Sequence, residues 1–147
     1  MMRCALRDSV KDVLEKMFFV ETLGESYTAA AASADQITAQ LTFEGQPPGS
    51  LTMRVTSAAA RQIAADFLGV DEQEVSELRV AEVVCELANM ICGSVLSRME
   101  SATAFHLSTP EIVAAPESPA TSPYSTVYGV ELANGRLGVN VTTGIPV

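Results

Sequence analysis

The sequence contains no tryptophan, a single histidine, and nine lysine and arginine residues against 18 aspartate and glutamate residues. Its formal net charge of −9 disfavours nucleic acid as a partner, because neutralising phosphates requires clustered basic side chains. The same charge disfavours an anionic membrane surface and suits a basic protein partner. Because aromatic residues are also scarce, we expect a core built mainly from aliphatic side chains and methionine.

The sequence also lacks long apolar runs and closely spaced cysteines. No uninterrupted apolar run of about 18 residues occurs, and the first ten residues lack the apolar stretch of a signal peptide. Cys85 and Cys92 fall on one expected helix with their Cα atoms about 10 Å apart, too far for a disulfide. We therefore predict reduced thiols, including that of Cys4, and a cytoplasmic location.

Several kinds of active site find no support in the sequence. Cysteine, histidine and carboxylate residues show no metal-ligand spacing, so we expect no metal or other cofactor of the protein's own. His106 is the only histidine, and Ser94, Ser97 and Ser101 have no evident histidine partner for a catalytic triad. The glycines of segment 129–138 lack the strand-to-helix context of a phosphate-binding loop.

Helical periodicity predicts three helices in one domain covering residues 1–147. The first helix is expected over 7–21, where one face carries apolar residues at spacings of three and four. The others are expected over 57–69, ended by Gly69, and over 81–101. The acidic segment 70–79 between them is expected to be a connection that is helical in part.

Alternation of apolar and polar residues predicts antiparallel strands over 37–45 and 50–57, joined by the turn sequence QPPG. A further strand is expected over 103–115. A hairpin after the Pro/Ser-rich loop is expected to close the chain, with Asn134 and Gly135 in a type I′ turn. Segment 26–36 is expected to be a strand, with a weak helix as the alternative. The predicted class is α+β, with an antiparallel sheet packed by the long helix and the N-terminal helix.

The long helix carries an unusual polar face. Its apolar stripe comprises Val84, Leu87, Ala88, Ile91 and Val95, whereas Glu82, Glu86, Asn89, Gly93, Ser97 and Glu100 fall on the opposite side. Glycine and asparagine weaken a helix interior, by about 1 kcal/mol relative to alanine for glycine. Glu86 and Asn89 are neighbours at i and i+3, and Gly93 leaves space beside Asn89 for close approach. The simplest alternative is an ordinary solvated face, but this composition suggests a task for it.

The segment "ELANMICGS" resembles the signature of the CheC/CheX class of chemotaxis phosphatases, which dephosphorylate the receiver domain of the response regulator CheY. The pattern is an acidic or serine residue, then glutamate, then asparagine, and later proline. This chain supplies Glu82, Glu86, Asn89 and Pro110. Glu82 replaces the more usual aspartate or serine, and the spacing to Pro110 is slightly short.

The resemblance implies roles for four residues of the long helix. Asn89 would enter the receiver's active site and hold the attacking water, and Glu86 would pair with a receiver lysine. Glu82 would be a docking contact, and Gly93 would give the clearance beside Asn89. The Mg²⁺ ion would belong to the receiver and not to this chain.

The first helix indicates which subclass the chain resembles. CheC-like proteins carry the motif on two helices, whereas CheX-like proteins carry it on one and form homodimers. Here Asp8, Asp12 and Glu15 stand where a second motif would need acid, glutamate and asparagine, so the resemblance implies a CheX-like protein with one site. Consecutive apolar residues at 17–19 exceed one helical face, which places Phe19 at a possible dimer contact.

Two other readings of the sequence stay open. The chain could be a catalytically silent module of the same shape that binds a receiver, or another partner, in a signalling or motility complex. It could also be an unrelated α+β structural domain. The pair Glu86 and Asn89 favours the phosphatase.

Overall fold

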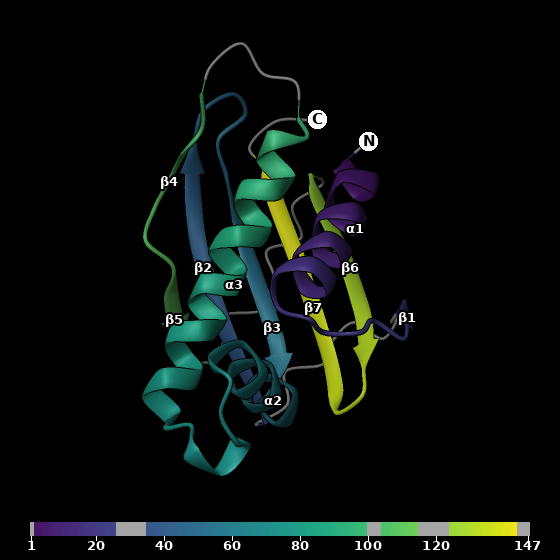
Figure 1. The fold of residues 1–147 in the computed structure, drawn as a ribbon. Helices are drawn as coiled ribbons and strands as arrows, with labels where there is room; N and C mark the ends of the chain where they lie inside the picture. Colours follow the sequence, from purple (N-terminus) through teal and green to yellow (C-terminus); the bar gives the residue numbers. More distant parts are fainter. Residues whose placement is uncertain (1, 26–34, 100–103, 115–123, 144–147) are drawn as a thin grey trace.

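The computed structural model describes residues 2–25, 35–99, 104–114 and 124–143. A seven-stranded antiparallel sheet forms one layer, and the described helices form a second layer on one face of it (Figure 1). The predicted α+β class, with a long helix and an N-terminal helix packed on an antiparallel sheet, is confirmed.

The sheet has the strand order β1-β6-β7-β3-β2-β4, and the short β5 also pairs with β2. All of its pairings are antiparallel. The central hairpins are long, whereas the edge strands β1, β4 and β5 have two or three residues each. The strands are β1 Gly24–Glu25, β2 Gln36–Glu44, β3 Gly49–Thr56, β4 His106–Leu107, β5 Glu111–Val113, β6 Ser125–Leu132 and β7 Gly135–Thr143.

The core lies between the sheet and the helices. Successive side chains of a strand point to opposite faces, so each central strand buries alternate residues under the helices. In β3 these are Leu51, Met53 and Val55, each with no exposed surface. The core cluster is mainly aliphatic, with methionine and a few aromatic rings, as the composition predicts.

The N-terminal helix differs from its predicted range of 7–21. It is α-helical over α1 (Met2–Asp12) and continues as a π-helical turn, η1 (Val13–Met17). The helix begins earlier because Met2 and Leu6 extend the buried face. It ends earlier because Phe19 adopts a left-handed conformation (φ 57°), which turns the chain before Gly24 is reached.

The second helix confirms its prediction closely. Helix α2 spans Ser57–Leu68, and Gly69 ends it with φ 71°. A short 3₁₀ turn, η2 (Glu72–Glu74), follows in the acidic connection. The connection is thus helical in part, as expected.

The long helix α3 spans Glu77–Ser97, so it begins and ends four residues before the predicted range of 81–101. It begins at Glu77 because Ser76 caps it, accepting a hydrogen bond from the amide of Arg79 at 3.2 Å. By length and hydropathy alone α3 could cross a membrane, a property shared by core helices of soluble proteins. In this structure, its apolar side packs on the sheet and on the other helices.

The predicted strand over 103–115 is instead two short strands, β4 and β5, separated by residues 108–110. Ser108 interrupts the ladder: its amide donates to the carbonyl of Thr42 at 2.8 Å, and its hydroxyl accepts from the amide of Thr42 at 2.9 Å. Pro110 has no amide hydrogen and cannot continue the pairing.

The turn of the last hairpin also differs from prediction. Leu132 pairs with Gly135, so the central residues of the turn are Ala133 and Asn134. Neither has a positive φ, which a type I′ turn requires, whereas Gly135 has φ 153°. A Cβ at Gly135 would lie 2.6 Å from that of Thr56, so the site favours glycine. The segment 26–34, within the strand predicted over 26–36, lies outside the described residues.

Candidate active site

The N-terminal end of α3 is held by α2. Arg61 donates from Nη1 to the carbonyl of Glu72 at 3.1 Å and to that of Val75 at 2.6 Å. These bonds fix the connection that leads into the Ser76 cap. These contacts therefore hold the N-terminal end of α3 in place, ahead of the polar face in the sequence.

The buried stripe of α3 agrees with its prediction. Val84, Leu87, Ala88, Ile91 and Val95 are all at most 1% exposed and face the sheet and neighbouring helices. Packing of this stripe directs Glu82, Glu86 and Asn89 away from the core. The polar face is thus presented by a rigid element.

A shallow open hollow of about 390 Å³ lies between α3 and the segment joining β4 to β5. Its lining brings together the four positions of the sequence motif, although Pro110 is distant from the others in sequence. It is lined by Ala81, Glu82, Cys85, Glu86, Asn89, Thr109 and Pro110. Gly93 does not line the hollow but lies one helical turn beyond Asn89.

The polar groups of the hollow differ in what they contact. Glu82 forms an ion pair with Arg79 over 3.2 Å. Glu86 is exposed, Asn89 is half-buried, and neither has a hydrogen-bond or ion-pair partner within the described part of the chain. The Glu86 carboxylate and the Asn89 amide are therefore available to an external group, more so than Glu82.

Gly93 is not required by the packing of this chain. A Cβ added at Gly93 would meet no atom within 4 Å. Within the part of the chain that the structure describes, no contact explains why a helix interior accepts the least favourable residue other than proline. The open space is on the side of the helix that presents Asn89.

Three residues of the hollow, Ala81, Cys85 and Thr109, were not identified as site residues from the sequence. Thr109 immediately precedes Pro110 on the wall opposite α3, and Cys85 adjoins Glu86. Burial raises the pKa of the Cys85 thiol, and the Glu111 carboxylate raises it further. Cys85 therefore stays protonated and is a poor nucleophile near neutral pH. The position of Thr109 beside the motif proline was the available signal for it.

The acidic residues of α1 are engaged within the chain. Asp8 pairs with Arg7 at 3.2 Å, and Asp12 pairs with Arg98 at 2.5 Å and with Lys16 at 3.6 Å. Their positions on α1 therefore do not reproduce the unpartnered pair of α3. Within the described residues, no group of three metal-binding side chains occurs.

Solved structures with the same fold come from chemotaxis proteins. The chain superposes on chemotaxis protein CheX from Vibrio vulnificus with a TM-score of 0.75 at 17% identity, covering 97% of this chain and 96% of that one. CheX in a CheX–CheY–BeF₃–Mg²⁺ complex from Borrelia burgdorferi gives a TM-score of 0.75 at 17% identity, covering 97% of each chain. Thermotoga maritima FliY gives 0.59 at 17% identity, covering 95% of this chain and 84% of that one.

The fold is therefore the one found in CheX- and CheC-like chemotaxis proteins. A search of curated proteins finds no match in sequence. The family model for chemotaxis phosphatase CheX matches residues 37–130, and the chain belongs to this family. The matched region contains every residue that lines the hollow.

Proposed function

We propose that this protein hydrolyses the aspartyl phosphate of a CheY-type receiver domain. The observation that carries the proposal is the presentation of Glu86 and Asn89, without partners in the described chain, at the edge of an open hollow on a rigid helix. Family membership supports phosphatase activity in general. A partner of this kind is seen in the CheX–CheY complex from Borrelia burgdorferi.

The reaction needs a water molecule placed in line with the phosphorus atom. The water oxygen forms a bond to phosphorus as the bond from phosphorus to the aspartyl oxygen breaks. The products are inorganic phosphate, which takes up the protons of the water, and a free aspartate carboxylate. Because phosphoryl transfer depends mainly on positioning and electrostatics, a phosphatase can act by ordering this water.

Asn89 has suitable chemistry for holding the water. Its amide both donates and accepts hydrogen bonds, and it carries no charge that would repel the phosphoryl group. A carboxylate in its place would add electrostatic repulsion. The amide is half-buried on α3, so few rotamers are lost when the receiver docks.

Glu86 acts as the anchor of the receiver. Its exposed carboxylate would pair with a lysine of the receiver and thereby set the position of Asn89 relative to the phosphate. Glu82 is a secondary docking contact, because Arg79 already engages it. Gly93 leaves room for the receiver backbone to approach α3 beyond Asn89.

The remaining parts of the proposal concern the assembly. The Mg²⁺ ion is that of the receiver, and this chain supplies no ligand to it. The protein would act in the cytoplasm, where receiver domains are phosphorylated, and as a homodimer, as the subclass resemblance implies. Sedimentation of the purified protein tests the homodimer directly.

The deciding experiment follows loss of phosphate from purified receivers of the same organism, with and without this protein. Faster loss with the protein supports the phosphatase. Binding of a phosphorylated receiver without faster loss would instead identify the catalytically silent module of a signalling or motility complex.

A further inference from the structure

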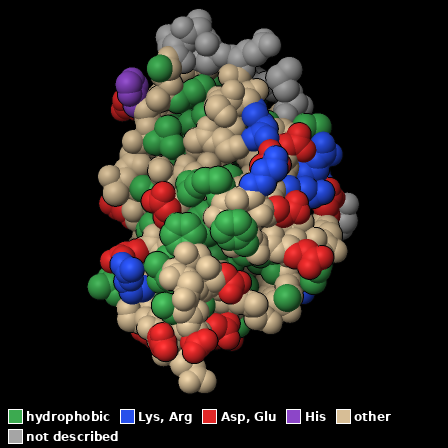
Figure 2. All heavy atoms as spheres, viewed as in Figure 1, with side chains coloured by type: hydrophobic (Ala, Val, Ile, Leu, Met, Phe, Trp, Pro, Cys, Tyr) green, Lys and Arg blue, Asp and Glu red, His purple; other side chains and the backbone are tan. Residues whose placement is uncertain are grey.

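An apolar patch lies on the helical face of the molecule beside the proposed site. We define it by three exposed side chains: Met17 at 49% exposure, Phe19 at 78% and Phe67 at 42%. Figure 2 shows hydrophobic side chains gathered near the middle of this face, with acidic side chains around them. Exposed apolar groups that cluster in this way are typical of interaction surfaces.

The patch is built around the end of the first helix. Phe18 is fully buried and its ring stacks on that of Phe67, with centroids 4.6 Å apart. Phe67, anchored on one face by this stack, keeps part of its ring exposed. The neighbours of Phe18 in sequence, Met17 and Phe19, complete the patch.

The backbone of Phe19 adopts a conformation that is unfavourable for phenylalanine. Its φ of 57° lies in the left-handed region, which disfavours a side chain with a Cβ, and glycine is the usual residue at such a helix end. The turn is fixed by a hydrogen bond from the amide of Val20 to the carbonyl of Leu14, at 2.8 Å. A strained backbone that displays an exposed aromatic ring suggests that the ring has a use outside the chain.

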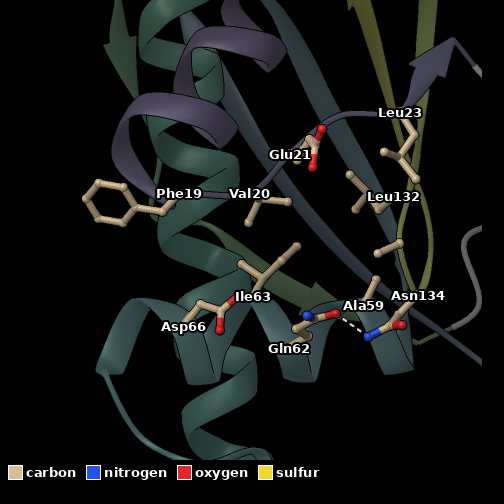
Figure 3. A pocket seen from close by; sticks show the side chains of 11 residues that line it. Phe19, Val20, Glu21, Leu23, Ala59, Gln62, Ile63, Asp66, Leu132 and Asn134 are labelled. Carbon is tan, nitrogen blue, oxygen red and sulfur yellow. Dashed lines mark hydrogen bonds between the residues drawn. The ribbon is translucent and has the colours of Figure 1, made fainter.

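Among the described residues, Phe19 borders a cavity, but its ring does not fill it (Figure 3). A hollow of about 210 Å³ lies between the segment 19–23, α2 and the turn of the last hairpin. In Figure 3 the side chain of Val20 lies over this hollow beside Ile63, whereas the ring of Phe19 points away from it. The ring is therefore left for another molecule.

The patch is continuous with the proposed site. The η1 turn packs against α3, and Figure 1 shows the end of the first helix beside the middle of α3. On α3, Met90 follows Asn89 and lies one turn after Glu86, so it bridges the two surfaces, and it packs partly on the core. A standard interface covers about 800 Å² per partner, a disc about 16 Å in radius. Because η1 packs against α3, an interface of this size that covers the polar face of α3 extends towards the patch.

We propose that Met17, Phe19 and Phe67 form the apolar half of the receiver-docking surface, with Phe19 as its anchor. The inference rests on the proposed function, because only a partner that reaches Asn89 must cover this patch. A second copy of the chain on the same patch would obstruct that partner. The receiver face that docks here carries an apolar side chain, facing Phe19, beside the lysine that meets Glu86.

The test replaces Phe19 with glycine, which removes the ring and suits the left-handed backbone. Receiver loaded with Mg²⁺ and beryllofluoride is titrated onto full-length protein, and phosphate loss is measured over a range of receiver concentrations. Phe19→Gly is expected to weaken binding and raise the half-saturating receiver concentration about tenfold. The rate of phosphate loss at saturating receiver should stay unchanged. The thermal stability should stay unchanged or rise, because glycine suits the left-handed backbone. The matched control is Val127→Ser, which removes an apolar side chain, 52% exposed, from the opposite face of the sheet.

Each outcome separates the two proposals. Unchanged receiver binding in Phe19→Gly overturns the docking surface, and loss of a dimer with binding unchanged assigns the patch to a second copy. Tight binding by the wild type without phosphate loss overturns the proposed hydrolysis, while the effect of Phe19→Gly on binding still decides the docking surface. Absence of binding by the wild type overturns both.

Discussion

Arg98, at the end of α3, donates from Nη2 to Oδ2 of Asp12 on α1 over 2.5 Å. Its other terminal nitrogen donates to the hydroxyl of Ser9, which is fully buried, at 3.0 Å. These bonds join the first helix to the helix that carries the proposed site. The Asp12 carboxylate, at the position where a second motif would need its glutamate, is thereby engaged within the chain. This agrees with a single site per chain.

Arg98→Ala should lower the free energy of unfolding by about 1–2 kcal/mol, because the buried hydroxyl of Ser9 loses a charged donor. Asp12→Ala should cost less, about 0.5 kcal/mol, because that carboxylate is partly exposed to solvent. Urea unfolding of both variants and of the double variant measures the coupling. Strictly additive effects would show that the ion pair contributes nothing to the contact between α1 and α3.

Gly93 allows stability and docking to be separated. Gly93→Ala should raise the free energy of unfolding by up to about 1 kcal/mol, because the added Cβ meets no atom and alanine favours the helix. Gly93→Leu should fold equally well but raise the half-saturating receiver concentration, since its side chain occupies the space beside Asn89. Unimpaired receiver binding by Gly93→Leu would contradict the proposal that Gly93 leaves space for the receiver beside Asn89.

The charge of Glu86 should matter for docking and not for folding. Glu86→Gln should raise the half-saturating receiver concentration about tenfold at low ionic strength, with a smaller effect at high salt. Its thermal stability should match the wild type, because Glu86 has no ion-pair partner within the described residues. The control is Glu72→Gln on the exposed η2 turn, which removes the same single negative charge. If both variants weakened receiver binding equally, Glu86 would act only through the net charge of the protein.

Ionisation of Cys92 should lower the free energy of unfolding at alkaline pH. Burial raises the pKa of its thiol from 9.0 to about 12. Between these values the unfolded chain ionises this group and the folded chain does not, so stability is full below pH 9 and falls as the pH rises towards 12. The slope approaches about 1.4 kcal/mol per pH unit. Urea unfolding between pH 8 and about 11 should show a smaller decline for Cys92→Ala than for the wild type, and parallel declines contradict the assignment.

The sequence predicted those elements whose residues repeat with one regular period. The stripe through Val84 and Ile91 identified α3, and alternation identified the strands β2 and β3. The ends of elements were less accurate, because tertiary contacts set them. The first helix, for example, ends before Gly24 at the left-handed turn of Phe19, next to Phe18, whose buried ring stacks on Phe67.

The candidate site was predictable only in part. Glu86 and Asn89 were identifiable as neighbours because helical spacing is regular. On the wall that faces them, the family pattern identified Pro110 but not Thr109, because Thr109 approaches α3 only through the pairing of β4 and β5 with β2. The turn at Asn134 was misassigned for a similar reason: contact with Thr56 governs the conformation of Gly135.

The central claim is that the Asn89 amide positions the attacking water, and Asn89→Ala tests it most directly. The measurement is the first-order loss of phosphate from a saturating phosphorylated receiver, with binding to the beryllofluoride-loaded receiver as control. We predict that Asn89→Ala binds the receiver with affinity close to the wild type and leaves only the receiver's own rate of phosphate loss. Stimulated hydrolysis at the wild-type rate in Asn89→Ala would contradict it.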